Sequence, residues 1–361
     1  MRTHPSLRRA GEFAAAAVLA FSLTACGGGN SSVSASSGSA PAASVTVEQV
    51  STLAGTGTWG AANGQAAVAT FNDPCGVFVD AAGNAYVADT GNHLIRKIDA
   101  SGNVTTLAAT THFDFPNGLT VDASGNVYIA DSGDNLIRKM DPNGNVTTLA
   151  GSSTGGAANG RGTAASFNFP TGLAVDASGN VFVADMGNNL IRKIDPSGNV
   201  TTLAGSGAQG SANGLGTTAS FKSPRGLALD ASGNLYVADS GNNVIRKIDA
   251  SGNVTTFAGS GAKGSVNAQG TAASFSAPSG VSLDTSGNVY VADSGNNLIR
   301  KIDAAGNVTT LAGSGAQGMT NGQGASASFY DPEGINVDAA GNVYVADTLN
   351  NVIRKIVATH S

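Results

Sequence analysis

The chain has 361 residues, of which 12% are charged and 50 are glycine, and its formal net charge is −5. This length allows one large domain or two ordinary ones. The weakly acidic balance offers no basic surface for nucleic acid, and abundant glycine without a Gly-X-Y period excludes collagen and favours many tight turns. The two cysteines, Cys26 and Cys75, lie in unrelated contexts, so a disulfide framework is not expected.

Residues 1–25 are predicted to be an export signal rather than part of the fold. Arg2, Arg8 and Arg9 form a positive segment, and the apolar stretch Phe13–Leu23 follows it. That stretch is too short to span a membrane as a mature helix. A positive segment before a short apolar one is typical of secretion signals.

The signal ends in Leu23-Thr24-Ala25-Cys26, which resembles the lipobox of bacterial lipoproteins. The resemblance implies cleavage before Cys26 and acylation of that residue, and several acyl chains together make a stable membrane anchor. An ordinary signal peptide with a chance cysteine is the alternative. Gly27 rather than aspartate follows the cysteine, which by similarity to Gram-negative lipoproteins favours the outer membrane. The expected location is therefore extracytoplasmic and lipid-anchored, at the bacterial outer membrane.

Residues 26–44 are rich in glycine, serine and alanine after the cysteine, and they are predicted to form a flexible tether. Such a chain has a mean span of roughly 25 Å. Residues 45–361 are predicted to form a single folded domain.

A sequence unit recurs six times in this domain. Each unit contains four short β-type runs, with Asp-x-Ser-Gly-Asn and similar segments where tight hairpins are expected. Six units of four antiparallel strands predict a β-propeller, with an open solenoid as the alternative. One aspartate per unit marks the period, and these markers are Asp89, Asp131, Asp185, Asp239, Asp293 and Asp347.

The two ends of the domain favour a closed ring over a solenoid. The sixth unit stops at Ile356-Val357, after its third run, whereas Val50–Gly55 matches the missing fourth run. Closure also removes the exposed edges that an open array has to protect. The predicted fold is all-β: a six-bladed propeller of four-stranded blades, closed by an N-terminal strand that completes the last blade.

The units resemble NHL repeats, which are named for an Asn-His-Leu triplet that stands here at Asn92-His93-Leu94. Other units carry Asn-Asn-Leu or Asn-Asn-Val in the same place. The resemblance extends over about residues 45–357 and implies the propeller fold. It implies little about function, because the fold hosts binding proteins and a few enzymes.

Strand order defines two faces. The links into each first strand and between the second and third strands lie on the face that we call the top, and the hairpins lie on the bottom. The closing strand runs from bottom to top, so the tether is expected to leave from the bottom. Five units have a long segment before the first strand, and we place these segments on the top. Each holds an asparagine eight residues before a phenylalanine that we expect to pin the segment between blades: Asn63 and Phe71, Asn159 and Phe167, Asn213 and Phe221, Asn267 and Phe275, Asn321 and Phe329.

Most charges belong to the repeat, and we interpret the Arg-Lys pairs of the third strands and the repeat aspartates as solvated pairs and turn bonds. The other charges are expected mainly in top-face segments and divide by sign around the ring. This predicts a polarised top face that orients a polar ligand, with scattered charges of no consequence as the alternative. The basic residues are Arg161, Lys222, Arg225 and Lys263, and the acidic ones are Asp73, Asp114, Asp134, Asp331 and Glu333, with Glu48 in the closing strand.

One position varies inside a constant Pro-x-Gly frame at the start of each first strand. It is predicted to lie at the top mouth of the central channel and to contact a ligand. An exposed position without any constraint is the alternative. The six residues are Cys75, Asn117, Thr171, Arg225, Ser279 and Glu333.

Similar propellers include lyases and lactonase-like hydrolases that use a metal, and such chemistry needs several convergent donors. Here His93 and His112 are the weak candidates for a metal site on the top face, and no metal or cofactor is expected. We interpret the protein as a monomeric binding or scaffolding module for a peptide, glycan or envelope-protein partner, rather than as an enzyme. A metal-assisted lyase or hydrolase near His93 and His112 is the alternative, and a purely structural assembly is a third possibility.

Overall fold

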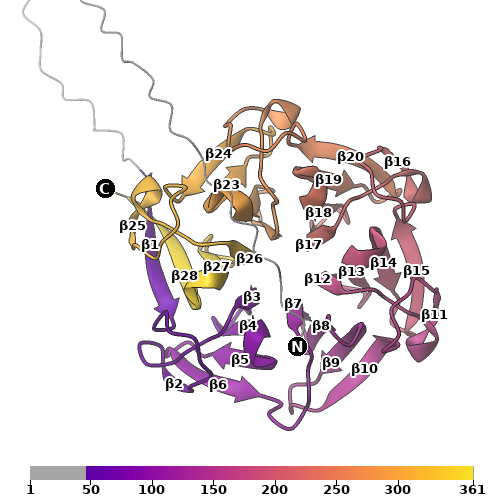
Figure 1. Cartoon of the computed structure of the whole chain (residues 1–361), viewed down its shortest axis with the longest axis horizontal. Coiled ribbons are helices and arrows are strands. Elements are labelled where there is room, and N and C mark those ends of the chain that lie inside the picture. Colours follow the sequence, from indigo (N-terminus) through magenta and orange to yellow (C-terminus); the bar gives the residue numbers. More distant parts are fainter. Residues whose placement is uncertain (1–45, 361) are drawn as a thin grey trace, which may run out of the picture. The chain divides into compact units, whose positions relative to one another are not determined.

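The computed structural model describes residues 46–360. The predicted signal peptide, the tether and Cys26 therefore lie outside the described residues. The described part is a ring of six β-sheets with only short 3-10 turns besides the strands (Figure 1). Among these residues, none of the helical segments has the length and apolar character needed to cross a membrane.

Every blade contains four antiparallel strands, which in blades 1 to 5 are ordered from the channel outward as they follow in the chain, whereas the fourth strand of blade 6 comes from the N-terminus. Blades 1 to 3 consist of β3 (Pro74–Val79), β4 (Ala85–Asp89), β5 (Leu94–Ile98) and β6 (Asn103–Leu107); β7 (Pro116–Val121), β8 (Val127–Asp131), β9 (Leu136–Met140) and β10 (Val146–Gly151); and β12 (Pro170–Val175), β13 (Val181–Asp185), β14 (Leu190–Ile194) and β15 (Asn199–Ala204).

The other three blades repeat this arrangement. They consist of β17 (Pro224–Leu229), β18 (Leu235–Asp239), β19 (Val244–Ile248) and β20 (Asn253–Ala258); β21 (Val281–Leu283), β22 (Val289–Asp293), β23 (Leu298–Ile302) and β24 (Val308–Ala312); and β26 (Pro332–Val337), β27 (Val343–Asp347), β28 (Val352–His360) and β1 (Thr46–Ala54).

The N-terminal strand closes the ring, which confirms the prediction. β1 pairs antiparallel with β28, and the register joins Val50 to Ile356 and Thr46 to His360. Val50 and Ile356 are both fully buried and share a core cluster with Val345. The first and last described strands are therefore neighbours in blade 6 (Figure 1).

The long segments do not stay on the top face, which corrects the prediction. They run along the outer edge of their blades, and in four blades they add a two-residue fifth strand. Arg161, expected on the top, lies in such a strand, and its Nε donates to Ser197 O in a bottom hairpin. An outermost strand has unpaired backbone groups, and this cover satisfies part of them. The added strands are β2 (Gly64–Gln65), β11 (Gly160–Arg161), β16 (Gly214–Leu215) and β25 (Gly322–Gln323), while blade 5 has a single bridge between Gln269 and Asn307.

The bottom hairpins form as their turn residues predict. In the first of them, Asp80 Oδ1 accepts hydrogen bonds from the backbone N–H groups of Ala82 and Asn84, each at 2.9 Å. Gly83 takes a φ of 81°, which a residue with a side chain rarely adopts. Partial burial works to raise the pKa of Asp80, but the hydrogen bonds outweigh it and lower that pKa below its ordinary value.

In five of the six Arg-Lys pairs the arginine is buried rather than solvated, which corrects a second prediction. In blade 4, Arg246 Nη1 lies 2.9 Å from Asp239 Oδ2, and both side chains are fully buried. Its guanidinium carbon lies 5.2 Å from the centre of the Phe221 ring. Lys247 lies over Tyr236 on the other side of the strand, so only the lysine is solvated. Matching buried pairs are Arg96–Asp89, Arg192–Asp185, Arg300–Asp293 and Arg354–Asp347.

The recurring asparagine and phenylalanine belong to this buried arrangement. Asn213 Oδ1 accepts a hydrogen bond from Arg246 Nη2 at 3.0 Å. Phe221 is fully buried in a cluster that contains residues of blades 3 and 4, including Ala184 and Val237. The expectation that the phenylalanine pins its segment between blades is confirmed.

Blade 2 departs from the pattern because its preceding segment is short. Arg138 Nε lies 3.5 Å from Asp131 Oδ2, and the arginine side chain is 18% exposed. Asp134 stands where the other blades have an asparagine that donates to the aspartate, as Asn242 does to Asp239. Burial, together with the charges of Asp134 and Asp114, raises the pKa of Asp131 to about 6.

We expect the substitution Arg246→Gln to destabilise the protein by about 3–5 kcal/mol, because it leaves the Asp239 carboxylate buried without its partner. The free energy of unfolding in urea measures this loss. The matched variant Arg138→Gln removes a longer, partly exposed pair and should cost less, and Lys247→Gln should cost least. Equal losses for Arg246→Gln and Arg138→Gln would contradict the importance of the complete buried pair.

Candidate functional site

The six Pro-x-Gly segments meet around the top of the central channel, where each glycine packs against the next blade. A methyl group at Gly226 would lie 2.5 Å from Ser279 O, far inside van der Waals contact. Gly226 N–H also donates to that carbonyl at 2.8 Å. The frame is therefore fixed by backbone contact, which leaves the side chain of x free to vary. The same steric relation joins Gly76 to Asn117, Gly118 to Thr171, Gly172 to Arg225, Gly280 to Glu333 and Gly334 to Cys75.

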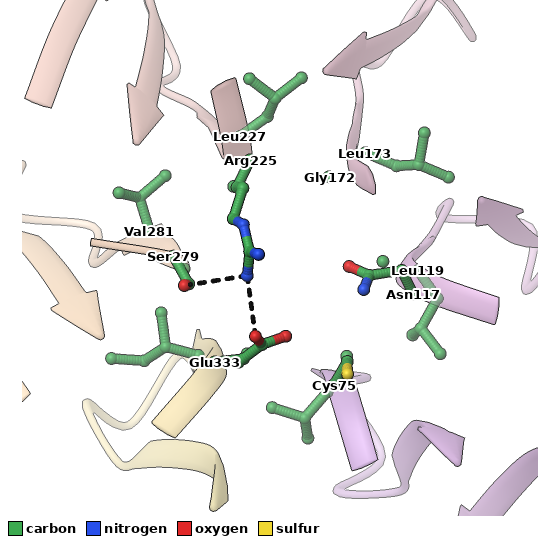
Figure 2. Close-up of a pocket in the computed structure, with 17 residues that line it drawn as sticks. Cys75, Asn117, Leu119, Gly172, Leu173, Arg225, Leu227, Ser279, Val281 and Glu333 are labelled. Carbon is green, nitrogen blue, oxygen red and sulfur yellow. Dashed lines mark hydrogen bonds and ion pairs between the residues drawn. The ribbon is translucent and has the colours of Figure 1, made fainter. Parts of the chain in front are cut away.

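Five of the six variable side chains face a small cavity at the channel mouth, as expected for them. The cavity has a volume of about 70 Å³, and the residues are Cys75, Asn117, Arg225, Ser279 and Glu333 (Figure 2). Thr171 is the exception, because its side chain is only 3% exposed and does not line this cavity, and ligand contact at the six positions stays a prediction. Its hydroxyl lies 3.3 Å from Arg225 O and is turned into the wall of the channel.

An ion pair crosses the mouth between blades 4 and 6. Arg225 Nη1 donates to Glu333 Oε1 at 2.8 Å and to Ser279 Oγ at 3.4 Å (Figure 2). Partial burial opposes the charged form of Arg225, but the neighbouring acidic groups, Glu333 first and then Asp331, together outweigh it and raise the pKa of the guanidinium. Two oppositely charged residues of the expected polarised face, Arg225 and Glu333, thus meet at the channel mouth.

Acidic groups outnumber basic ones beside this pair. Burial raises the pKa of Asp331 to about 6, the Glu333 charge adds to the rise, and Arg225 opposes it. Burial and then Glu333 also raise the pKa of Asp73. The Glu333 charge thus acts on both aspartates, and Arg225 opposes the rise at Asp331.

Cys75 is not set up as a nucleophile. Burial and the neighbouring Glu333 charge raise the pKa of its thiol well above the ordinary value. The thiolate, not the thiol, attacks substrates and binds metals, so the raised pKa disfavours both roles at neutral pH. Its Sγ donates to Asp73 O at 3.4 Å.

An apolar ring forms the floor of the mouth. The residue after each glycine of the frame lines both the mouth and a second cavity of about 250 Å³ below it. A polar group that enters from the top therefore meets charge first and hydrocarbon beneath it. Sequence reasoning did not identify this apolar ring. The available signal was the apolar residue that follows Pro-x-Gly in all six units: Val77, Leu119, Leu173, Leu227, Val281 and Ile335.

The candidate metal ligands His93 and His112 do come together, with ring centres 6.4 Å apart. However, His93 Nδ1 accepts a hydrogen bond from Phe115 N at 3.2 Å, and it lies 3.3 Å from Asp114 Oδ1. In other blades an asparagine accepts the equivalent hydrogen bond, as Asn189 Oδ1 does from Ser223 N at 2.9 Å. His93 therefore has a structural role. Across residues 46–360 no group of three or more histidine, cysteine, aspartate or glutamate side chains is placed to hold a metal ion.

Comparison with known families identifies the repeat. The sequence matches the NHL repeat at residues 221–248 and 275–302. It matches the SMP-30/Gluconolactonase/LRE-like region at residues 110–212.

Two curated relatives have longer chains. "Protein SUPPRESSOR OF QUENCHING 1, chloroplastic" of Arabidopsis thaliana is 29% identical over 304 residues, which are 80% of this chain and 25% of that protein. "NHL repeat-containing protein 2" of Homo sapiens is 31% identical over 237 residues, which are 56% of this chain and 32% of that protein. The chain thus spans about a quarter to a third of these relatives.

Solved structures share the fold at low sequence identity. A Bacteroides thetaiotaomicron protein of unknown function has a TM-score of 0.71 at 22% identity, covering 87% of this chain and 77% of that one. An auxiliary nutrient binding protein of the same organism has a TM-score of 0.69 at 19% identity, with the same coverage. Streptogramin B lyase has a TM-score of 0.58 at 15% identity, covering 87% of this chain and 98% of that one. These likenesses show the propeller fold.

We expect the Asp331 carboxyl to titrate near pH 6, as its pKa indicates. Because the pKa in the folded state lies above the ordinary 3.8, protonation stabilises the fold at low pH, and this contribution is lost as the pH rises through about 6. Glu333→Gln removes a repulsion and should lower this pKa, whereas Arg225→Gln removes an attraction and should raise it. Carbon-13 NMR titration of the side-chain carboxyl measures both shifts. The remote hairpin carboxyl of Asp284 is the control, and a shift of the same sign in both variants would contradict the assignment.

Proposed function

We propose that this NHL-repeat β-propeller is a binding module, and that the mouth of its central channel accepts a basic side chain of a polypeptide partner. The observation that carries the proposal is the charge around the small cavity. Glu333 pairs with Arg225, while Asp331 and Asp73 add negative charge beside that pair. An incoming cation relieves this repulsion and gains Glu333 as a partner.

The size of the mouth favours part of a large partner over a whole small ligand. Pockets for drug-sized ligands have volumes of about 300–1,000 Å³. The mouth has a volume of about 70 Å³, which suits the tip of one side chain. The rest of the partner would then lie on the top face. Among the expected partners, this argument favours a peptide or an envelope protein over a glycan.

Neighbours of this fold are named for different activities, since one is an auxiliary nutrient binding protein and another a streptogramin B lyase. At their low identity they support the fold alone, so the proposal rests on the side chains of the mouth. The lyase or lactonase alternative gains no support from the candidate residues. His93 is held by Phe115 N, and Cys75 keeps its proton at neutral pH.

Short blocked peptides test the proposal. We expect acetyl-Gly-Arg-Gly-amide to bind with a Kd on the order of millimolar, because a small flexible peptide gains few contacts. The matched peptide with glutamate in place of arginine should not bind. NMR titration that follows the signals of Asn117 and Ser279 locates the site and gives the affinity.

Substitutions of Glu333 and Arg225 should change the affinity for the arginine peptide in opposite directions. Glu333→Gln should weaken binding of the arginine peptide at least tenfold, about 1.4 kcal/mol. Arg225→Gln should tighten it, because Arg225 competes with the ligand for Glu333. Arg161→Gln, on the outer rim, should change nothing. Equal weakening by Glu333→Gln and Arg225→Gln, or binding of the glutamate peptide, would refute the proposed recognition.

We also propose that acyl chains on Cys26 anchor the protein at the bacterial outer membrane, on the support of the lipobox-like sequence alone. Cys26→Ser should abolish incorporation of a labelled fatty acid and release the protein from the membrane fraction. Cys75→Ser is the matched control and should retain the label. A labelled Cys26→Ser protein would exclude this anchor.

A further inference from the structure

Blade 2 lacks the cover that the other blades carry along the outermost strand. In blades 1, 3, 4 and 6 a short added strand pairs with the outermost strand, and blade 5 has a bridge in the same place. The sheet of blade 2 ends at β10, and Figure 1 shows no strand outside it. Val146 at the start of β10 is half-buried, whereas the equivalent Val254 of blade 4 is fully buried.

The covered blades show what this position accepts. In blade 4, Gly214 and Leu215 pair with Val254 and Asn253 at the edge of the sheet. The preceding Asn213 places its Oδ1 3.0 Å from Arg246 Nη2 and 3.4 Å from Thr256 Oγ1. One amide oxygen therefore joins the buried arginine to the outermost strand. The same two contacts are made by Asn63, Asn159, Asn267 and Asn321.

Blade 2 keeps the donors but lacks this acceptor. Arg138 Nη1 donates directly to Thr148 Oγ1 at 2.8 Å, where the other blades insert the asparagine oxygen. The arginine is 18% exposed, and the equivalent arginines are fully buried. Asp131 Oδ2 is buried and accepts no hydrogen bond from any described residue. Arg138 and Thr148 therefore lie beside an uncovered strand edge, where both can donate to an added acceptor.

We propose that the outer edge of blade 2 binds an extended segment of another polypeptide that carries an Asn-Gly pair. The segment adds a strand to β10 beside Asn145 and Val146, and its asparagine oxygen accepts from Arg138 and Thr148. A backbone edge selects a polypeptide, because only another strand matches its spacing of donors and acceptors. A neutral amide is favoured over a carboxylate, because Asp131 already balances the charge of Arg138. This site lies on the outer rim and is independent of the channel mouth.

The probe is an acetylated and amidated decapeptide with the sequence of residues 208–217, which contains the Asn-Gly pair of blade 4. We expect it to shift the backbone amide signals of Gly144–Val146 and the side-chain signals of Arg138. The Kd should be on the order of millimolar, because the free peptide has to be ordered. Replacing its asparagine with alanine should weaken binding at least tenfold.

Two variants of the protein complete the test. Arg138→Lys keeps the charge but loses the planar fork, so it should weaken binding to the same extent, whereas Arg161→Lys on the rim of blade 3 should not. Replacing Thr110–His112 with residues 206–220 gives blade 2 a cover of its own and should abolish peptide binding in a folded protein. The proposal is overturned if millimolar peptide causes no shifts. It is also overturned if the affinity does not change when the peptide asparagine or Arg138 is replaced, or if the grafted protein binds the peptide as tightly as the original protein.

Discussion

The buried ion pair between the third-strand arginine and the marker aspartate is the interaction on which each complete blade depends. Burying the guanidinium and the carboxylate away from water costs free energy. Their mutual attraction offsets this cost only where the other N–H groups of the arginine also donate to acceptors. In blade 4 these acceptors are Ser220 O, Ala212 O and Asn213 Oδ1, all from the long segment, and Nε alone stays without a hydrogen bond. The segment and the pair therefore stabilise each other: the segment satisfies the guanidinium, and the guanidinium holds the segment against the rim.

The same aspartate links the buried pair to the channel mouth. Asp239 Oδ1 accepts a hydrogen bond from Lys222 N at 2.7 Å, just before the Pro-x-Gly frame that holds Arg225. In blade 6, Asp347 Oδ1 accepts from Tyr330 N at 2.8 Å, just before the frame of Glu333. The backbone of the mouth is thus fixed from beneath by aspartates and from the side by glycine contacts. Variable side chains on this fixed backbone can change the chemistry of the mouth without moving the backbone.

The ring and its closure followed from the sequence, because the period and the displaced strand Val50–Gly55 are local patterns that need no knowledge of side-chain direction. The buried arginines did not follow. Adjacent arginine and lysine point to opposite faces of a strand, and the composition does not tell which one is inside. The signal was the asparagine and phenylalanine at constant distance from the aspartate. The pairing of Arg225 with Glu333 and the inward turn of Thr171 depend on the radius of the ring and on neighbouring carbonyl groups, which no single repeat encodes.

A perfectly repeated ring would offer six equal positions and no way to orient a partner. This chain departs from its repeat in the variable residues of the mouth and in the short segment before blade 2, and both departures leave the four strands and the Pro-x-Gly frame of each blade in place. The second leaves the start of β10 uncovered, and the sequence Val-Thr-Thr-Leu-Ala-Gly of this strand contains no lysine or proline to oppose pairing with another strand. In the other blades the cover makes such protection unnecessary. Where the cover is missing, the strand edge is uncharged and the neighbouring Arg138 side chain is partly exposed. This composition favours pairing with another strand.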